Sequence, residues 1–438
     1  MSGIVGIWSS ELASIDLYLG LYALQHRGTK YAGITISNES RFHKHSKSGL
    51  LRRVFEDISI LREAKGASGI GIVGNRISTD ATSTHAQPCI ATIHKVPYSA
   101  CLSGVVTNHN ILRDKLEKEG AILATDSYAE LLVHLANRSR RSSLIEKTIQ
   151  AIDQLEGSFT IIVLTPYFLL AARDSLGNRP LSLGALPDGG FIIASETTAF
   201  GPVRAKFTED VPPGGVLVIS RDNLARYQLS HRAPYALCSL ELINLASSDS
   251  QVFGKSTCLF RKEIGAIMGR QESAKADIVI PTPKSGLYFV AGFSEATGLP
   301  IVMALTSNDF AMRESFPNSR SFLNVKFSLI GELITGENVI LVDDIVQSTR
   351  TAQHLIRLLE QSGKVKRIYL RACCPPVKSK LCPFRRSPIV IEVADYEVFG
   401  KKDPGEFLGV TSFDFPNLEI IKRTLGEEAK DFCFACLK

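Results

Sequence analysis

Short apolar runs separated by turn residues fill the first half of the chain. Gly and Pro mark the turns, and the runs have the length and spacing of strands. Apolar residues at helical spacing interrupt this pattern twice. The pattern predicts strands at residues 160–164, 168–172, 191–194 and 216–219 and helices at 16–26 and 127–136. It is typical of stacked antiparallel sheets that are covered by helices.

From about residue 255 the pattern changes to alternating strands and helices. Apolar runs predict strands at 278–280, 301–305, 339–342 and 368–372, with helices between them. This alternation is typical of a parallel α/β sheet. Pro234 marks the change. We therefore predict two domains, 1–232 and 233–438, although a length of 438 residues allows two or three.

Residues 339–351 are the most informative segment of the chain. Their aliphatic run predicts a buried strand, and two adjacent carboxylates, Asp343 and Asp344, end it. A hydroxyl-rich loop follows, and then helical spacing from Ala352 to Leu359. Hydroxyls and amides at a helix N-terminus bind phosphate, and paired carboxylates suit sugar hydroxyls or hydrated Mg²⁺. The segment thus suits a ribose 5-phosphate; the alternative is a solvated Asp-Asp turn before an ordinary capped helix.

Composition and charge exclude several classes of function. The net charge of +6 permits anionic ligands, but no basic run is interleaved with aromatic residues as a nucleic-acid groove requires. No apolar run approaches the roughly 20 residues of a membrane span. The first residues lack the features of a signal peptide, so we expect a cytoplasmic protein without a nucleic-acid or membrane partner. Nine cysteines in such a protein indicate metal ligands or buried thiols rather than disulfides.

The carboxylate segment resembles the phosphoribosyl-pyrophosphate (PRPP) loop of the type I phosphoribosyltransferases. It is most similar to the loop of the glutamine PRPP amidotransferases. Asp343, Asp344 and Thr351 match that loop, whereas Ser348, Thr349 and Arg350 replace its Arg, Gly and Thr. The resemblance implies that Asp343, Asp344, Ser348, Thr349 and Thr351 bind PRPP with Mg²⁺, or a purine nucleotide.

The first half resembles the class II glutamine amidotransferases. The matching motifs are Ser2-Gly3-Ile4-Val5-Gly6, Leu24-Gln25-His26-Arg27-Gly28, Arg76 with Ser78 and Thr79, and Arg173-Asp174-Ser175-Leu176-Gly177-Asn178-Arg179. The resemblance implies an N-terminal-nucleophile αββα sandwich followed by a type I phosphoribosyltransferase parallel α/β domain. It also implies catalytic positions at Ser2 (nucleophile), Arg76 (clamp for the glutamine carboxylate), and Ser103 and Gly104 (oxyanion hole).

Three departures from the family fall on this chemistry. Ser2 stands where the family has its nucleophilic Cys, and a hydroxyl is harder to activate than a thiol. Ser103 replaces the Asn whose amide stabilises the oxyanion. Tyr128 replaces the Asp that binds the α-amine of glutamine, and Asp126 lies two residues away. We therefore expect glutamine hydrolysis to be impaired. The nitrogen source stays open between glutamine and ammonia.

Two further segments resemble the ligand-binding loops of the transferase domain. Residues 280–286 are similar to the pyrophosphate loop. Ser285 and Gly286 match the Ser and Gly of that loop, and Lys284 stands in place of its Asp. Residues 307–315 are similar to the flexible lid, which here keeps Arg313. Lys326 matches a phosphate-facing Lys. The resemblance adds Lys284, Ser285, Gly286, Arg313 and Lys326 to the PRPP or nucleotide site.

Four cysteines stand where one branch of this family holds a [4Fe–4S] cluster. They are Cys238, Cys382 after a Pro-Pro turn, and Cys433 and Cys436 in a C-terminal Cys-x-x-Cys. Thiolate sulfur is the ligand that selects such clusters. The alternative is that these four are buried or bind zinc. The remaining cysteines, Cys89, Cys101, Cys258, Cys373 and Cys374, are expected to be core thiols.

Two functions from different classes remain open. The first is an amidophosphoribosyltransferase of purine nucleotide biosynthesis, which converts PRPP and glutamine or ammonia to 5-phosphoribosylamine and pyrophosphate. The second is a catalytically inactive paralogue that acts as a nucleotide-binding regulatory or partner subunit. The family implies a homo-oligomer, or a hetero-oligomer with an active paralogue.

Overall fold

The computed structural model describes residues 2–38, 41–75, 87–221, 223–308, 320–346, 349–377 and 403–437. The chain divides into two compact units. The first is Met1–Cys238 with Asp249–Gly254, and the second is Ser239–Ser248 with Lys255–Lys438.

Two antiparallel sheets form the first unit. The seven-stranded sheet has the order β11-β9-β10-β1-β4-β2-β3, and the six-stranded sheet has the order β13-β12-β8-β7-β6-β5. The strands of the first are β1 (Ser2–Trp8), β2 (Tyr31–Ser37), β3 (Phe42–Ser48), β4 (Ser68–Gly74), β9 (Ser182–Ala185), β10 (Phe191–Ala194) and β11 (Lys206–Asp210). Those of the second are β5 (Cys89–Ile93), β6 (Val96–Val106), β7 (Gly157–Leu164), β8 (Phe168–Arg173), β12 (Gly215–Ser220) and β13 (Asn223–Gln228).

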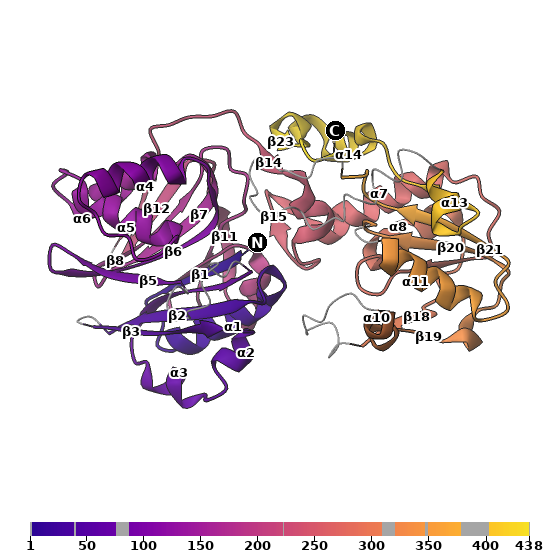
Figure 1. Cartoon of the computed structure of the whole chain (residues 1–438), viewed down its shortest axis with the longest axis horizontal. Coiled ribbons are helices and arrows are strands. Elements are labelled where there is room, and N and C mark those ends of the chain that lie inside the picture. The colour runs from indigo at the N-terminus through magenta and orange to yellow at the C-terminus, as the bar shows by residue number, and fades with distance from the viewer. Residues whose placement is uncertain are drawn as a thin grey trace. The chain divides into compact units, whose positions relative to one another are not determined.

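Alternation along the strands builds a four-layered unit. Ile162 of β7 packs in the core between the sheets, whereas Ile161 packs under the helices on the outer face. In the same way Ile4 of β1 faces the other sheet and Val5 faces α1. The helices are α1 (Ala13–Ala23), α2 (Leu51–Val54) and α3 (Ser59–Glu63) on one side, and α4 (His109–Lys118), α5 (Tyr128–Arg138) and α6 (Leu144–Asp153) on the other. Figure 1 shows these two helical layers outside the two sheets, so the unit is the expected αββα sandwich.

The helix bounds follow their capping residues. α5 begins after Ser127, whose hydroxyl accepts a bond from the Ala129 amide, close to the predicted start. α6 begins with a capping box between Ser143 and Glu146. The predicted helix at 16–26 is displaced: α1 runs from Ala13 to Ala23, and a short 3₁₀ turn follows it.

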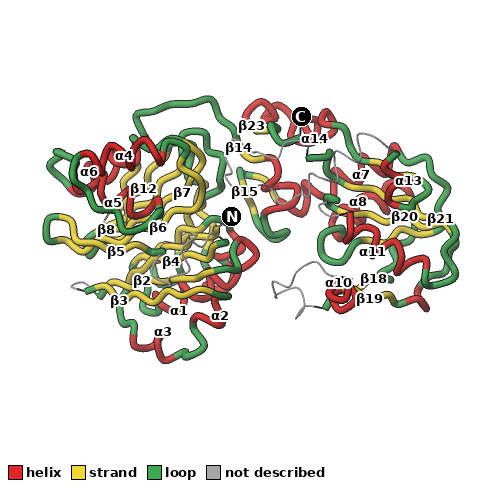
Figure 2. The backbone as a smooth tube through the Cα atoms, viewed as in Figure 1, coloured by secondary structure: helices red, strands yellow, loops and turns green. Residues whose placement is uncertain are grey.

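The second unit is built on a parallel sheet of order β17-β20-β21-β22. Figure 2 labels its strands β20 and β21. Its strands are β17 (Ile278–Pro281), β20 (Asn338–Asp343), β21 (Arg367–Ala372) and β22 (Ser412–Asp414). The longer helices are α7 (Thr257–Gln271), α8 (Leu287–Thr297), α11 (Thr349–Glu360) and α14 (Leu418–Leu425), and the shorter ones α10 (Arg320–Lys326) and α13 (Pro404–Leu408). The parallel α/β fold is as predicted, and the apolar face of α11 packs on β20 and β21.

One predicted strand of this unit was wrong. In residues 301–305 only Ile301 forms a bridge, to Val279, and Leu305 begins β18 (Leu305–Ser307), which pairs antiparallel with β19 (Phe327–Leu329). Met303 is 49% exposed and Ile301 is 38% exposed. The apolar run therefore lacks the two-sided burial of an inner parallel strand.

A buried ion pair holds the turn after α1 to the end of β10. Arg27 and Glu196 are 1% and 0% exposed and bond to each other. His26 lies 2.8 Å from Glu196, and the Ser250 hydroxyl donates to the carboxylate at 2.7 Å. Burial alone would raise the pKa of Glu196, but Arg27 and His26 hold it well below its usual range.

In the described part of the chain, no helix is both long enough and apolar enough to cross a membrane.

We predict that Glu196→Gln lowers the unfolding free energy of the first unit by about 3 kcal/mol, because it leaves Arg27 buried without a counter-charge. Urea unfolding followed by the fluorescence of Trp8, the single tryptophan, measures this. The Glu196 pKa is depressed on folding, so its contribution is present above pH 4.5 and is lost as the pH falls further. The matched control is Glu209→Gln, which breaks the exposed pair with Arg226 and should cost less than about 1 kcal/mol. Equal costs for the two variants would contradict this account.

Candidate functional site

Two loops meet at the carboxyl ends of neighbouring parallel strands. β17 and β20 pair in register up to Pro281 and Val342, so residues 282–286 emerge beside Asp343. The Thr282 and Ser285 hydroxyls donate to Asp343 Oδ1 at 2.6 and 2.9 Å. Ligands of open α/β sheets bind at this edge. The predicted pyrophosphate loop and the predicted carboxylate loop are therefore joined through Asp343.

The 282–286 loop is tightly wound against β20. The Thr282 amide donates to the Val342 carbonyl at 2.8 Å, and the Gly286 amide donates to the Thr282 carbonyl at 3.1 Å. A Cβ on Gly286 would lie 2.4 Å from the Val342 oxygen, so only glycine fits there. Lys284 is exposed at the loop tip with a φ of 71°, a left-handed conformation that is costly for a residue with a Cβ.

Asp344 is more deeply buried than Asp343. It is 8% exposed, its Oδ2 accepts from Asn244 Nδ2 at 2.5 Å, and its Oδ1 accepts from the Ile345 amide at 2.7 Å. Burial, and then the neighbouring charge of Asp343, raise the pKa of Asp344 well above its usual range. The surroundings of Asp344 therefore favour the protonated form of its carboxyl group.

The other predicted residues of the transferase site are partly described. Thr349 begins α11 and is buried, and Thr351 is half-buried in its first turn. Lys326 ends α10, where burial lowers its pKa and its ammonium lies 5.0 Å from the Phe327 ring centroid. Ser348 and Arg313 lie outside the described residues.

In the first unit, Ser2 and Ser103 are brought together. Ser2 begins β1, and the Ser103 hydroxyl donates to the Ser2 carbonyl at 2.7 Å. Gly104 has a φ of 139°, and a Cβ there would lie 2.1 Å from the Ser158 carbonyl oxygen. Arg76 lies outside the described residues. The Ser103 hydroxyl is thus bonded within the protein, at the position where the family has an amide donor.

The position of the family's amine-binding Asp is occupied by a core aromatic ring. Tyr128 is 4% exposed and packs edge-on against His109, with ring centroids 5.0 Å apart. Asp126 lies on the surface, 3.3 Å from Arg113. Neither residue presents a carboxylate from the first turn of α5.

The predicted cluster ligands are also partly described. Cys238 and Cys436 are 7% and 5% exposed, Cys433 is half-buried, and Cys382 lies outside the described residues. The Ser239 hydroxyl donates to the Cys433 carbonyl at 2.8 Å. Within the described ranges, no group of three or more His, Cys, Asp or Glu side chains could hold a metal ion. Among the expected core thiols, Cys101, Cys373 and Cys374 are buried, and Cys89 and Cys258 are half-buried.

Comparison with known proteins identifies the family. Residues 74–202 match the family model described as a glutamine amidotransferase domain. An amidophosphoribosyltransferase of Staphylococcus aureus (strain MRSA252) is 31% identical over 85% of this chain and 76% of its own length. A chloroplastic amidophosphoribosyltransferase of Arabidopsis thaliana is 31% identical over 99% of this chain and 77% of its own. The chain belongs to the amidophosphoribosyltransferase family.

Solved structures agree with this assignment over the whole chain. The glutamine PRPP amidotransferase from B. subtilis complexed with ADP and GMP has a TM-score of 0.89 and 26% identity, covering 100% of this chain and 96% of that chain. A structure described as the allosteric regulatory enzyme of purine biosynthesis has a TM-score of 0.90 and 26% identity, covering 100% and 95%. As an amidophosphoribosyltransferase family member, the chain has the family's two-domain fold.

Two contacts at the transferase site were not found from the sequence. Thr282 and Asn244 bond to the paired carboxylates from 61 and 100 residues away in the chain. Thr282 lies in a segment that the sequence did single out. No local pattern distinguishes Asn244 from other polar residues.

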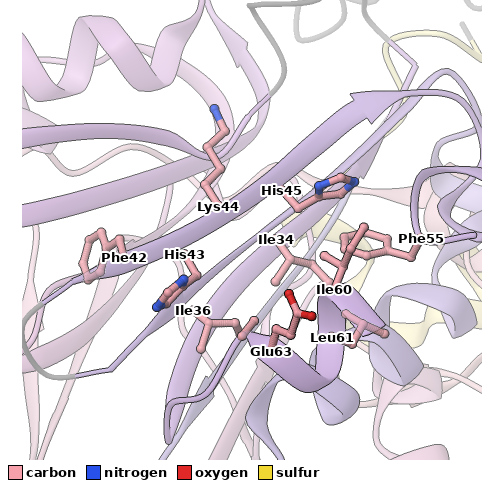
Figure 3. Close-up of a pocket in the computed structure, with 11 residues that line it drawn as sticks. Ile34, Ile36, Phe42, His43, Lys44, His45, Phe55, Ile60, Leu61 and Glu63 are labelled. Carbon is pink, nitrogen blue, oxygen red and sulfur yellow. The ribbon is translucent and has the colours of Figure 1, made fainter. Parts of the chain in front are cut away.

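A pocket of about 390 Å³ was also missed. It lies between β3 and α3 of the first unit, and none of the predicted site residues lines it (Figure 3). Most of the residues that line it are apolar, and the four polar ones are His43, Lys44 and His45 of β3 and Glu63 of α3.

The raised Asp344 pKa predicts a pH-dependent cost of folding. A carboxyl group whose pKa rises on folding contributes fully below its unfolded value of 3.8, and that stability is lost as the pH rises through the folded pKa. Asp344→Asn removes the titrating carboxyl group. We therefore expect the stability of the second unit in the variant, relative to the unsubstituted protein, to increase from about pH 5 to about pH 8, a range that lies above the unfolded pKa. Urea unfolding followed by circular dichroism measures it, and the Trp8 transition of the first unit is the internal control. A difference in unfolding free energy between the two proteins that does not change with pH would be inconsistent with the buried carboxylate pair.

Proposed function

We propose that this chain is an amidophosphoribosyltransferase of purine nucleotide biosynthesis whose transferase half binds Mg²⁺-PRPP and whose glutaminase half is impaired. The observation that carries the proposal is the pair of bonds from Thr282 and Ser285 to Asp343. They support one ligand site at the ends of β17 and β20 in which carboxylates and a phosphate-type loop face the same ligand. PRPP offers the ribose hydroxyls and pyrophosphate that such a site would recognise.

The roles we assign follow from the chemistry of each group. Asp343 and Asp344 accept bonds from the ribose hydroxyls, and the first turn of α11, with Thr349 and Thr351, receives the 5-phosphate. The 282–286 loop receives the pyrophosphate through its amides. Mg²⁺ bound with PRPP would offset negative charge on the pyrophosphate. Ammonia then forms a bond to C1 of the ribose as the bond from C1 to pyrophosphate breaks and a proton is released.

Glutamine is the less suitable nitrogen source. Ser2 is a weak nucleophile unless its own amine removes the hydroxyl proton. Ser103, bonded to the Ser2 carbonyl, supplies no amide donor, and Tyr128 lies in the core where the family has a carboxylate. Loss of one oxyanion donor alone costs about 10²–10³ in rate. We therefore propose ammonia, free or delivered by another protein, as the nitrogen source.

A second candidate function is favoured by the acidic residues of the lid sequence. A cation at the strained tip of the pyrophosphate loop replaces a family carboxylate, and Asp309 and Glu314 add negative charge to the lid sequence. The two lid carboxylates would repel pyrophosphate, so they favour binding of a nucleoside monophosphate, which shares the ribose 5-phosphate of PRPP but has no pyrophosphate. Lys284 is compatible with either ligand, because it would contact phosphate directly. The chain would then act as a nucleotide-binding subunit, alone as a homo-oligomer or with an active paralogue.

We also propose that Cys238, Cys382, Cys433 and Cys436 hold a [4Fe–4S] cluster. The donor set fits, since thiolates are the ligands of such clusters. Two of these residues, Cys238 and Cys436, are buried, and the tail carbonyl of Cys433 is bonded to Ser239, which follows Cys238 in the chain. The cluster would supply bonds that hold the tail, because the site exists only in the folded chain.

We expect PRPP-dependent release of pyrophosphate with ammonia and essentially none with glutamine. Ser2→Cys should not restore the glutamine reaction, because the residues at positions 103 and 128 still lack the amide and the carboxylate. Asp344→Asn should lower the ammonia reaction at least about tenfold by removing a charged acceptor. Robust glutamine turnover that Ser2→Ala abolishes would refute the impaired glutaminase. Binding of GMP without pyrophosphate release from either nitrogen source would favour the second candidate.

Anaerobically purified protein should be brown and contain about four iron and four sulfide per chain. Cys436→Ser should bleach it and expose the tail to proteolysis. Cys258→Ser is the matched control, since Cys258 is half-buried on α7 and is no proposed ligand, and it should leave the colour and iron content unchanged. Equal iron content in the two variants would rule out this ligand set.

A further inference from the structure

We propose that Asn244 is a positioning residue for Asp344, and that the segment Ser239–Ser248 connects the cysteine tail to the ribose-binding carboxylate. This deepens the proposed function, on which it rests for the role of Asp344. Nothing in the sequence motifs assigns a role to Asn244. The inference stands on three sets of contacts, all within the second unit.

The first set is the bond between the two side chains. Asn244 Nδ2 donates to Asp344 Oδ2 at 2.5 Å, while the Ile345 amide donates to the other carboxylate oxygen at 2.7 Å. Each oxygen therefore has a fixed partner, and the plane of the carboxylate is set before a ligand arrives. A hydrogen bond from a neutral amide to a carboxylate also offsets the cost of a second negative charge beside Asp343.

The second set holds Asn244 itself in place. It lies in a π-helical turn, Glu241–Leu245, a type of turn that is frequent at functional sites. Arg261 of α7, which is 7% exposed, donates to the Leu242 carbonyl at 3.0 Å, the Ala246 carbonyl at 2.7 Å and the Ser248 hydroxyl at 2.8 Å. A buried guanidinium thus fixes the backbone on both sides of Asn244, so the amide is held with little freedom to turn away.

The third set joins the same segment to the tail. Ser239, which is 1% exposed, donates its hydroxyl to the Cys433 carbonyl at 2.8 Å. Ser239 and Asn244 lie in one short segment, with its middle fixed by Arg261. A change in the tail at Cys433 therefore reaches Asp344 through the backbone of the six residues from Ser239 to Asn244.

The bond between Asn244 and Asp344 is tested by ligand affinity. Isothermal titration calorimetry with GMP and Mg²⁺ should show about tenfold weaker binding for Asn244→Leu, which loses the donor. Asn244→Asp should bind more weakly still, because it adds a third carboxylate of nearly unchanged shape. The matched control is Asn108→Asp in the first unit, where Asn108 donates to the Gln154 carbonyl at 2.9 Å, and its affinity should be unchanged. Affinities equal to that of the unsubstituted protein for both Asn244 variants would overturn the proposal.

A swap of the two side chains tests the same bond without a ligand. In the double variant Asn244→Asp with Asp344→Asn the donor and acceptor exchange places, so its unfolding free energy should exceed the value that the two single variants predict by addition. Additive effects would overturn the pairing. If the unsubstituted protein binds neither GMP nor PRPP, the proposed function fails, yet this cycle still decides whether Asn244 holds Asp344.

Transmission from the tail is tested by Ser239→Ala. We expect it to weaken GMP binding about threefold, as loss of one neutral hydrogen bond does. In an Asn244→Leu background the same change should have no further effect, because the connection is already broken. A full effect in both backgrounds, or none in either, would refute the connection to the tail while leaving the positioning role of Asn244 to the two experiments above.

Discussion

The second unit depends on keeping two adjacent carboxylates at the end of a buried strand. β20 lies between β17 and β21, so Asp343 and Asp344 emerge where three parallel strands end together. Two like charges at neighbouring positions with little solvent repel each other, and hydrogen bonds donated by the surrounding residues offset this repulsion. Thr282 and Ser285 bond to Asp343, and Asn244 bonds to Asp344. The pyrophosphate-type loop and the π-helical turn are thereby both fixed to the same few atoms.

The first unit has the contacts that support its fold, whereas three residues at its expected glutamine site differ from those of the family. Its sandwich retains the buried Arg27–Glu196 pair and the alternating strand faces that support the fold. Two of the three departures from the family have contacts within this framework: Ser103 bonds to the Ser2 carbonyl, and Tyr128 packs in the core beside His109. The buried Tyr128 ring adds apolar contact area to the core of this unit.

Polar groups have different surroundings in the two regions where ligands are expected to bind. In the transferase half, polar groups converge on the carboxylates from loops that are far apart in the sequence. In the amidotransferase half, the Ser103 hydroxyl bonds to the Ser2 carbonyl, and Tyr128 packs in the core. This contrast is the physical basis of our proposal that the transferase half binds a phosphoribosyl group or a nucleotide and that glutamine hydrolysis is impaired. Through the segment Ser239–Ser248, hydrogen bonds connect the tail at Cys433 to Asp344 in the transferase half.

The sequence by itself determined the elements whose pattern is local. Alternating and unbroken apolar runs predicted β7, β8, β10, β12, β17, β20 and β21, because each core-facing position of a buried strand is apolar and the pattern can be seen within the run itself. It also determined where the paired carboxylates stand. It misplaced α1 and predicted an inner strand at 301–305, since solvent exposure of Ile301 and Met303 depends on what packs beside them. Only the tertiary structure decided that Thr282 meets Asp343 and that Asn244 meets Asp344, because a hydrogen bond across 61 or 100 residues leaves no periodic trace in the chain.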